Sequence, residues 1–152
     1  MDIKRQNPLA KHFRQPILYI SLPSQGKWYP ADALDVPVNG QLPIYAMTAK
    51  DEITMKTPDA LLNGASTAHV IESCCPGIKD PWKMPTVDLD TILIAIRLAT
   101  YGEMMTTPIK IQDLELEYQV DLRTIMDQLA SQINWNPVVP INDKLTVFVK
   151  GL

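Results

Sequence analysis

The sequence has no hydrophobic run long enough to cross a membrane and no apolar segment near its first residue. The longest apolar stretch, residues 92–96, is followed at once by Arg97, whereas a membrane-spanning helix needs about 20 apolar residues. The early polar residues and Pro8 do not form the apolar core of a secretory signal. We therefore expect no membrane partner, and a protein that is made and used in a cytoplasm.

Residues that commonly perform catalysis or bind metals are also scarce. The chain has two histidines, His12 and His69, and two adjacent cysteines, Cys74 and Cys75. Neighbouring cysteines rarely bridge each other, because the bond strains the peptide between them. His69 and Cys74 are five residues apart, which does not place them on one helical face. We expect reduced, partly buried thiols, no metal site and no cofactor; a cysteine nucleophile with His69 as its base is the enzymatic alternative.

Acidic pairs offer little more support for catalysis. Asp51 with Glu52, or Asp88 with Asp90, could serve glycosidase or magnesium chemistry. Each pair lies where a helix is expected to begin, and acidic residues stabilise a helix start without any catalytic role. The chain also lacks a glycine-rich phosphate-binding loop. We therefore predict that the protein is not an enzyme.

The net charge is only −3, but the charge is unevenly distributed. Residues 1–27 contain five basic residues and one acidic residue, and residues 28–152 contain nine basic and sixteen acidic residues. Because residues 1–16 also contain two prolines, we expect an extended basic arm there, followed by a single domain over residues 17–152. Such an arm suits an acidic partner, including a second copy of the chain; a solvated tail is the alternative. The acidic body disfavours nucleic-acid binding.

The succession of expected strands and helices predicts an α+β fold. It would consist of a central buried helix, a cluster of short helices, small antiparallel hairpins and the N-terminal arm. The central helix is expected over about residues 89–101, because its side chains are apolar nearly all round. We expect Thr86 or Asp88 to cap its first turn and Gly102 to end it in a left-handed conformation.

Three short helices are expected before the central one. Thr48 lies three residues before Asp51, which resembles a capping box and predicts a helix to about residue 55. Thr57, followed by a proline, predicts the start of a second helix. Ser66 or Thr67 is expected to begin the third. Together these signals predict a compact helical cluster.

Strands are expected on both sides of the helices. A β-branched and aromatic run at residues 17–22 predicts one strand, and the Asn-Gly pair inside residues 36–45 predicts a hairpin. Residues 108–111 and 114–122 predict two more strands, joined around Gln112 and Asp113. The second of them alternates apolar and polar residues, which predicts one buried and one solvent-exposed face.

The C-terminal part continues with one more helix and one more strand. Asp121 is expected to cap a helix over residues 123–133, which carries an apolar stripe. Residues 134–140 are expected to form a rigid loop. Residues 144–149 predict a terminal strand that needs a partner, in this chain or in another, because an isolated strand leaves its backbone groups unpaired.

A series of short motifs runs in the same order as in a known family of phage proteins. The motifs are residues 22–30 (LPSQGKWYP), 47–52 (MTAKDE), Pro58 with 62–64 (LNG), 70–71 (VI) with Cys74 or Cys75 and Pro76, Asp88 with Asp90, and 96–97 (IR) with 101–102 (YG). Together they resemble the baseplate hub assembly protein family of T-even-type contractile bacteriophages. The resemblance covers about residues 17–122.

The resemblance implies a structural protein of the tail baseplate hub without enzymatic activity, located in the virion tail and, during assembly, in the host cytoplasm. It implies partners among other hub and tail proteins, including the central spike complex and the end of the tape measure. The alternative is an assembly chaperone for hub subunits that is absent from the mature particle. Relatives carry a Cys-x-x-Cys pair before the equivalent of residues 117–122, but residues 106–112 here contain no cysteine, so a metal knuckle is not implied.

Partner binding is expected from the basic side chains of the arm and from aromatic side chains in turns. These residues are Lys4, Arg5, Lys11, Arg14, Trp28, Tyr29 and Trp82. A homo-oligomer is also allowed, because strands at sheet edges can pair with another chain.

Overall fold

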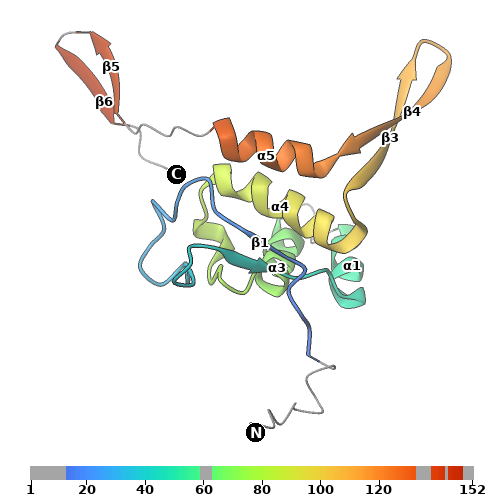
Figure 1. Cartoon of the computed structure of the whole chain (residues 1–152), viewed down its shortest axis with the longest axis horizontal. Coiled ribbons are helices and arrows are strands. Elements are labelled where there is room, and N and C mark those ends of the chain that lie inside the picture. Colours follow the sequence, from blue (N-terminus) through green and yellow to red (C-terminus); the bar gives the residue numbers. More distant parts are fainter. Residues whose placement is uncertain (1–12, 59–62, 133–137, 143, 149–152) are drawn as a thin grey trace, which may run out of the picture.

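The structure, a computed structural model, describes residues 13–58, 63–132, 138–142 and 144–148. Its helices there are α1 (Ala49–Met55), α3 (Ala65–Cys74), α4 (Thr86–Tyr101), α5 (Leu122–Gln132) and a short 3-10 helix, η2 (Pro81–Lys83). Its strands are β1 (Leu18–Ile20), β2 (Leu42–Ile44), β3 (Met104–Ile111), β4 (Leu114–Asp121), β5 (Val138–Asn142) and β6 (Leu145–Phe148). Among the described residues they pair in three antiparallel sheets, β1 with β2, β3 with β4 and β5 with β6. The predicted α+β fold is confirmed (Figure 1).

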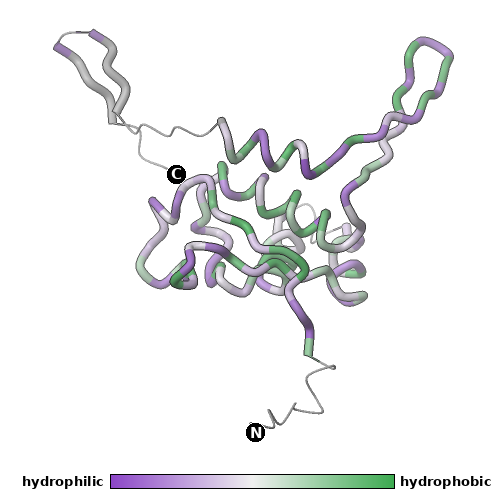
Figure 2. Tube along the Cα trace, in the orientation of Figure 1, coloured by the Kyte–Doolittle hydropathy of each residue, from purple (hydrophilic) through white to green (hydrophobic). Residues whose placement is uncertain are grey.

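Helix α4 lies in the middle of the body, with α5 along one side and α3 and β1 on the other (Figure 1). Its Ile92 and Ala95 are completely buried and Ile96 is nearly so, and they join Leu42 and Ile44 of β2 in one core. Figure 2 shows hydrophobic residues concentrated in this central region. Burial of these side chains is the main force that stabilises the body. The predicted central buried helix is confirmed.

The ends of α4 differ in part from the prediction. Neither Thr86 nor Asp88 caps the helix, because the N-cap residue is Pro85 and Asp88 lies inside the first turn. Gly102 ends the helix, as predicted, with a φ of 89° that glycine adopts without steric cost. Its ψ of −173° is extended rather than left-handed helical. The Asp88 carboxylate is not available for capping because it binds a distant turn, described below.

The short helices follow the expected order. Helix α1 begins with the predicted capping box, in which Thr48 Oγ1 accepts from the Asp51 N–H and the Asp51 carboxylate accepts from the Thr48 N–H. Helix α3 begins at Ala65, just before the predicted start, after a glycine in the left-handed conformation. The helix predicted from Thr57 begins at Pro58, which is helical, but its remaining residues, 59–62, lie outside the described residues.

The hairpin predicted around Asn39 and Gly40 is wrong. Strand β2 pairs with β1 instead, with Leu18 opposite Ile44. The Asn-Gly pair closes a local turn in which the Gly40 N–H donates to the Pro37 carbonyl at 2.8 Å. Pairing with β1 places two side chains of β2 completely inside the core, whereas the residues before the turn are exposed. The pairing of β2 with β1 is therefore favoured by the burial of one face of β2.

Two hairpins project from the body, one beyond each end of α5 (Figure 1). The first, β3 with β4, is the predicted pair, and Gln112 in its turn has the positive φ, 57°, that a tight hairpin turn requires. The second, β5 with β6, supplies the partner that the terminal strand needed. Because β5 begins at Val138, the loop predicted over residues 134–140 is wrong at its end, where backbone groups bond to β6.

Candidate functional site

The β3–β4 hairpin has one apolar face and one polar face. Ile109 stands opposite Leu116 and Ile111 stands opposite Leu114. Because directly opposed residues point to the same face of a sheet, these four side chains lie together. Tyr118, two residues beyond Leu116 in β4, extends the same face toward the base of the hairpin. We call the strip formed by these five residues the apolar face of the hairpin.

Nothing in the described part of the chain covers this apolar face. The exposed fractions are 38% for Ile109, 57% for Ile111, 63% for Leu114, 47% for Leu116 and 59% for Tyr118. The sequence predicted that these alternating residues would be buried, and for this chain alone that prediction is wrong. The two faces of the hairpin do differ chemically, as the alternation predicted. Because the hairpin extends beyond the core, however, both faces are exposed to solvent (Figure 1).

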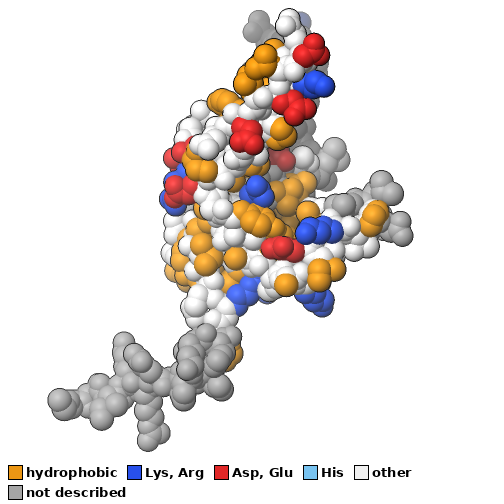
Figure 3. Space-filling view, turned by 90° about the vertical axis from the view of Figure 1, so that its right-hand side faces the viewer, with side chains coloured by type: hydrophobic (Ala, Val, Ile, Leu, Met, Phe, Trp, Pro, Cys, Tyr) orange, Lys and Arg blue, Asp and Glu red, His pale blue; other side chains and the backbone are white. Residues whose placement is uncertain are grey.

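The opposite face of the hairpin is polar and mainly acidic. Lys110 stands opposite Glu115, and Glu117 stands opposite Pro108. Figure 3 shows hydrophobic side chains along one side of the projecting hairpin and charged side chains along the other. Large contiguous apolar patches are uncommon on isolated soluble chains and often mark interaction sites. This division of the surface therefore fits contact with another protein.

The base of the hairpin is fixed to α5. Both Nε and Nη2 of Arg123 lie 2.7 Å from the Glu103 Oε1 atom, and the Leu122 N–H donates to the Glu103 carbonyl at 2.8 Å. Asp121 caps α5, as predicted, by accepting from the Arg123 N–H at 2.9 Å. Leu122 itself is buried. The hairpin is therefore held in a defined direction even though its strands are exposed.

Arg14, which the sequence predicted to bind a partner, is engaged within the chain. Its guanidinium donates to the Ser73 carbonyl at 2.8 Å and to the Ser73 hydroxyl at 3.1 Å. It also donates to the Ala46 carbonyl, and it lies 3.7 Å from the Asp51 carboxylate and over the Tyr45 ring. These contacts join α1, α3 and the segment after β2. Arg14 therefore anchors the end of the N-terminal arm to the body.

Asp51 lies at the centre of this anchor and is almost completely buried. Its carboxylate accepts hydrogen bonds from Thr48 and Ser73, and His69 Nε2 lies 3.8 Å from its Oδ1. Burial by itself would raise the pKa of Asp51, but the hydrogen bonds from Thr48 and Ser73 and the charge of Arg14 hold that pKa below its usual value. The carboxylate is therefore ionised at neutral pH and stabilises the anchor.

The two cysteines are buried free thiols. Burial raises the pKa of Cys74 and raises that of Cys75 to about 11, whereas a nucleophilic cysteine needs the thiolate form. Cys74 Sγ accepts a hydrogen bond from Arg14 at 3.4 Å. His69, the base required by the enzymatic alternative, approaches Asp51. A protonated, enclosed thiol is a poor nucleophile, so this arrangement does not favour cysteine chemistry.

The turn that carries Trp28 and Tyr29 is fixed to α4 through Asp88. The completely buried Asp88 carboxylate accepts from the Ser24 N–H at 2.9 Å, from the Ser24 hydroxyl and from the Tyr29 hydroxyl at 2.8 Å. Burial, and then the charge of Asp88, raise the pKa of Tyr29, so its phenol stays protonated and donates. Trp28 is half-buried in the same turn, with a φ of 67°. The sequence missed this role of Asp88 because its partners lie far away along the chain.

The remaining residues predicted to bind partners are separated from these. Trp82, in η2, is 67% exposed, and its ring lies close to Gly64, where an added Cβ atom would come within 3.3 Å of it. Lys4, Arg5 and Lys11 lie outside the described residues. The structure therefore does not gather the described members of the predicted set into one site.

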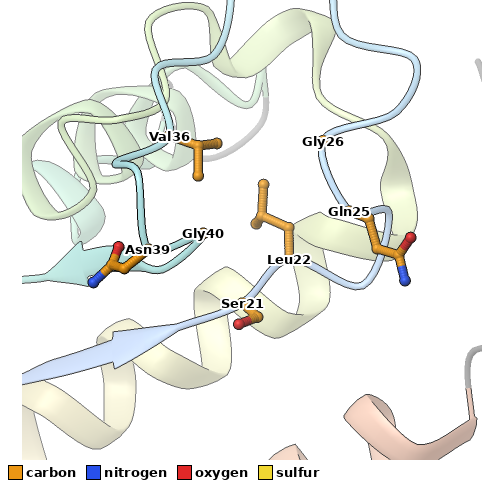
Figure 4. Close-up of a pocket in the computed structure, with 7 residues that line it drawn as sticks. All are labelled: Ser21, Leu22, Gln25, Gly26, Val36, Asn39 and Gly40. Atoms are coloured by element: carbon orange, nitrogen blue, oxygen red, sulfur yellow. The ribbon is translucent and has the colours of Figure 1, made fainter.

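A hollow of about 370 Å³ opens between the turn after β1 and the turn before β2. The side chains of Leu22 and Val36 point into it (Figure 4). Its polar lining groups are the Ser21 hydroxyl and the amides of Gln25 and Asn39. None of the described residues that line it is ionisable, so this hollow lacks groups for acid–base chemistry.

A second hollow, of about 350 Å³, lies between α1 and α4. Apolar side chains such as Met47, Met55 and Leu93 line it, together with the charged side chains of Glu52 and Arg97. Figure 3 views the molecule from the side of α1. This hollow offers apolar contact area bordered by charge rather than a set of catalytic groups.

Metal clusters and membrane helices are absent from the described residues. Within them, no group of three or more histidine, cysteine, aspartate or glutamate side chains is placed to hold a metal ion. Over the same part of the chain, no helix combines the length and the apolar character needed to cross a bilayer.

No protein-family model, curated protein or solved structure matches this chain. The family resemblance therefore rests on the motifs within residues 22–102. The candidate site rests on the geometry of the hairpin.

The apolar face of the hairpin was not among the partner-binding residues expected from the sequence. The alternation over residues 114–122 marks this face in the sequence, but the apolar residues of that alternation were predicted to be buried in the domain. Alternation marks a face that avoids water, and it carries no information about which molecule covers that face.

Proposed function

We propose that the protein is a structural or assembly subunit of a contractile phage tail baseplate hub that acts through protein–protein contacts. The observation that carries the proposal is the exposed apolar face of the hairpin, on which Leu114 and Tyr118 are more than half exposed. Covering apolar area is favourable by about 25 cal/mol per Å², so this face is expected to be buried on assembly. The motifs that resemble baseplate hub assembly proteins supply the biological setting.

The way the hairpin is attached supports this role. The Glu103–Arg123 ion pair and the Asp121 cap fix its base to α5, and α5 packs along α4. A partner therefore meets a surface whose direction is set before binding. Such preorganisation lowers the entropic cost of association.

The test is complementation of the phage that encodes this protein after deletion of its gene. Leu116→Lys places a charge in the middle of the apolar face, and Gln119→Lys places the same charge on the polar face of the same strand as a control. We expect Leu116→Lys to lower the yield of assembled tails by about tenfold or more, because a buried unpaired charge is costly. Gln119→Lys is expected to assemble like wild type. Equal yields from the two variants would contradict the proposal.

The same exposed face also suits an assembly chaperone that covers a hub subunit and then leaves. Mass spectrometry of purified tails separates the two roles. Presence of the chain in a fixed ratio to other hub proteins supports a component, and its absence supports a chaperone. In both cases the Leu116→Lys variant is expected to fail in assembly.

A further inference from the structure

We infer that a free edge of the β3–β4 hairpin binds residues 1–12 of a second copy of this chain, so that copies join head to tail. The inference rests on the proposed function, in which the hairpin is an assembly interface, and it names the segment that binds there. Four features carry it: the two faces of the hairpin, its acidic charge, the composition of the arm and the position of the Arg14 anchor.

The hairpin suits an extended peptide that has two kinds of side chain. Among the described residues, β3 and β4 pair only with each other, so each strand has one edge with no neighbouring strand. An extended segment can add to such an edge as a third strand. Its side chains then lie beside both the apolar and the acidic side chains of the hairpin. The fitting segment therefore carries both apolar and basic residues.

Charge excludes several other occupants. Residues 104–121 contain four acidic residues and a single basic residue, Lys110. Glu117 stands opposite Pro108, which cannot balance its charge. An acidic peptide added to this edge would therefore be repelled, and so would the hairpin of a second copy added edge to edge.

Residues 1–12 have the required composition. They contain three basic residues, Lys4, Arg5 and Lys11, and one acidic residue, Asp2, together with a methionine, an isoleucine and a leucine. Residues 28–152 are acidic, with nine basic and sixteen acidic residues. Twelve extended residues span at most about 40 Å, which is enough to follow the eight residues of β3 or of β4.

The Arg14 anchor favours a neighbouring copy over the hairpin of the same chain. The described chain begins at Phe13 on the side of the body away from α5, whereas the β3–β4 hairpin projects from the side of α5 (Figure 1). Arg14 is held on that far side by Ser73 and Ala46. The arm therefore starts from a fixed point that faces away from its own hairpin.

The resulting contact joins two different surfaces, the arm of one copy and the hairpin of the next. Such heterologous contacts produce a closed ring when the rotation between copies closes, and an open filament when it does not. The wild-type chain is therefore expected to form oligomers larger than a dimer as its concentration rises.

The test is a pair of charge-reversed full chains. The arm variant carries Lys4→Glu, Arg5→Glu and Lys11→Glu, and the hairpin variant carries Glu115→Lys and Glu117→Lys. Light scattering after size-exclusion chromatography measures the mass of each over a range of concentrations. We expect the wild type to exceed the 17.1 kDa of one chain and each variant alone to remain monomeric. An equimolar mixture is expected to recover the wild-type mass, because every arm then meets a hairpin of opposite charge.

Either of two mass measurements would overturn the inference: a wild type that is monomeric throughout, or a mixture that stays monomeric. Salt provides a second measurement on the unaltered chain. The oligomer is expected to dissociate as the salt concentration rises, because exposed charges are screened, and an oligomer that is indifferent to salt would also contradict the inference. If the wild type is monomeric while Leu116→Lys still blocks tail assembly, the proposed function stands and self-association alone is wrong.

Discussion

Helix α4 and the β3–β4 hairpin both carry large apolar surfaces, but the chain buries only that of the helix. Ile92 and Ile96 pack in the core with residues of β2 and α3, whereas Leu114 and Tyr118 face solvent. The difference arises because α4 has neighbouring elements on several sides, while the hairpin extends past the end of α5 (Figure 1). Apolar character alone therefore does not decide whether a surface is buried within the chain, because burial depends on the arrangement of the elements around it.

The largest effect is expected from truncation inside the core. Ile96→Ala should lower the free energy of unfolding by about 2–5 kcal/mol, because it leaves a cavity in a packed site. Ile96 is only 2% exposed. Urea-induced unfolding followed by circular dichroism measures the change. A loss below about 0.5 kcal/mol, typical of surface positions, would show that Ile96 and its helix are not packed in the core.

The buried polar contact of α4 should give the next largest effect. Asp88→Ala is expected to cost about 1.5–3 kcal/mol, because Ser24 and Tyr29 lose a charged hydrogen-bond acceptor. Asp90→Ala, at an exposed position of the same helix, is the matched control and should change stability by less than about 0.5 kcal/mol. Urea unfolding at neutral pH compares the two variants. Equal losses would mean that Asp88 acts only through its charge near the helix start.

The Arg14 anchor should make the body sensitive to acid. The folded-state pKa of Asp51 lies below its unfolded value of about 3.9. Its stabilising contribution is therefore present above that value and is lost as the pH falls through the folded-state pKa. Asp51→Asn should cost about 1–2 kcal/mol at neutral pH, and the difference from wild type should shrink below about pH 4. Urea unfolding at a series of pH values measures it; a difference that stays constant with pH would contradict this origin.

Truncation of the apolar face of the hairpin should have the smallest effect on folding. Leu116→Ala is expected to change the free energy of unfolding of the monomer by less than about 0.5 kcal/mol, because the side chain lies outside the core and is about half exposed. Urea unfolding at low protein concentration measures this value. A loss comparable to that of Ile96→Ala would show that the chain itself packs against this face.

Predictions that depend on neighbouring residues were largely confirmed. The capping box of Thr48 and Asp51, the glycine stop at Gly102 and the Asp121 cap each involve residues a few positions apart, so the local sequence contains the whole interaction. The hairpin around Asn39 is wrong because burial of β2 against β1 outweighed a favourable turn. A turn signal states where a chain can reverse, and it does not state which strands will pair.

The candidate site was only partly predictable for the same reason. The alternation in β4 revealed its apolar residues, but the sequence did not show that no described residue covers that face. Arg14 was recognisable as a basic residue of the arm, yet its engagement by Ser73 and Asp51 depends on how α1 and α3 meet. Partner binding by Lys4, in the same arm, remains a prediction, because Lys4 lies outside the described residues.

Residue types and their spacing were enough to place the central helix and the strands of the β3–β4 hairpin, to divide that hairpin into an apolar and an acidic face, and to show that residues 1–27 are basic. These properties repeat with the period of a helix or a strand, so they can be read along the chain. The packing of distant segments decided that β2 pairs with β1, that Asp88 binds a turn, and that the apolar face of the hairpin stays exposed. Those outcomes depend on competition for one shared core, which involves residues that are far apart in the sequence.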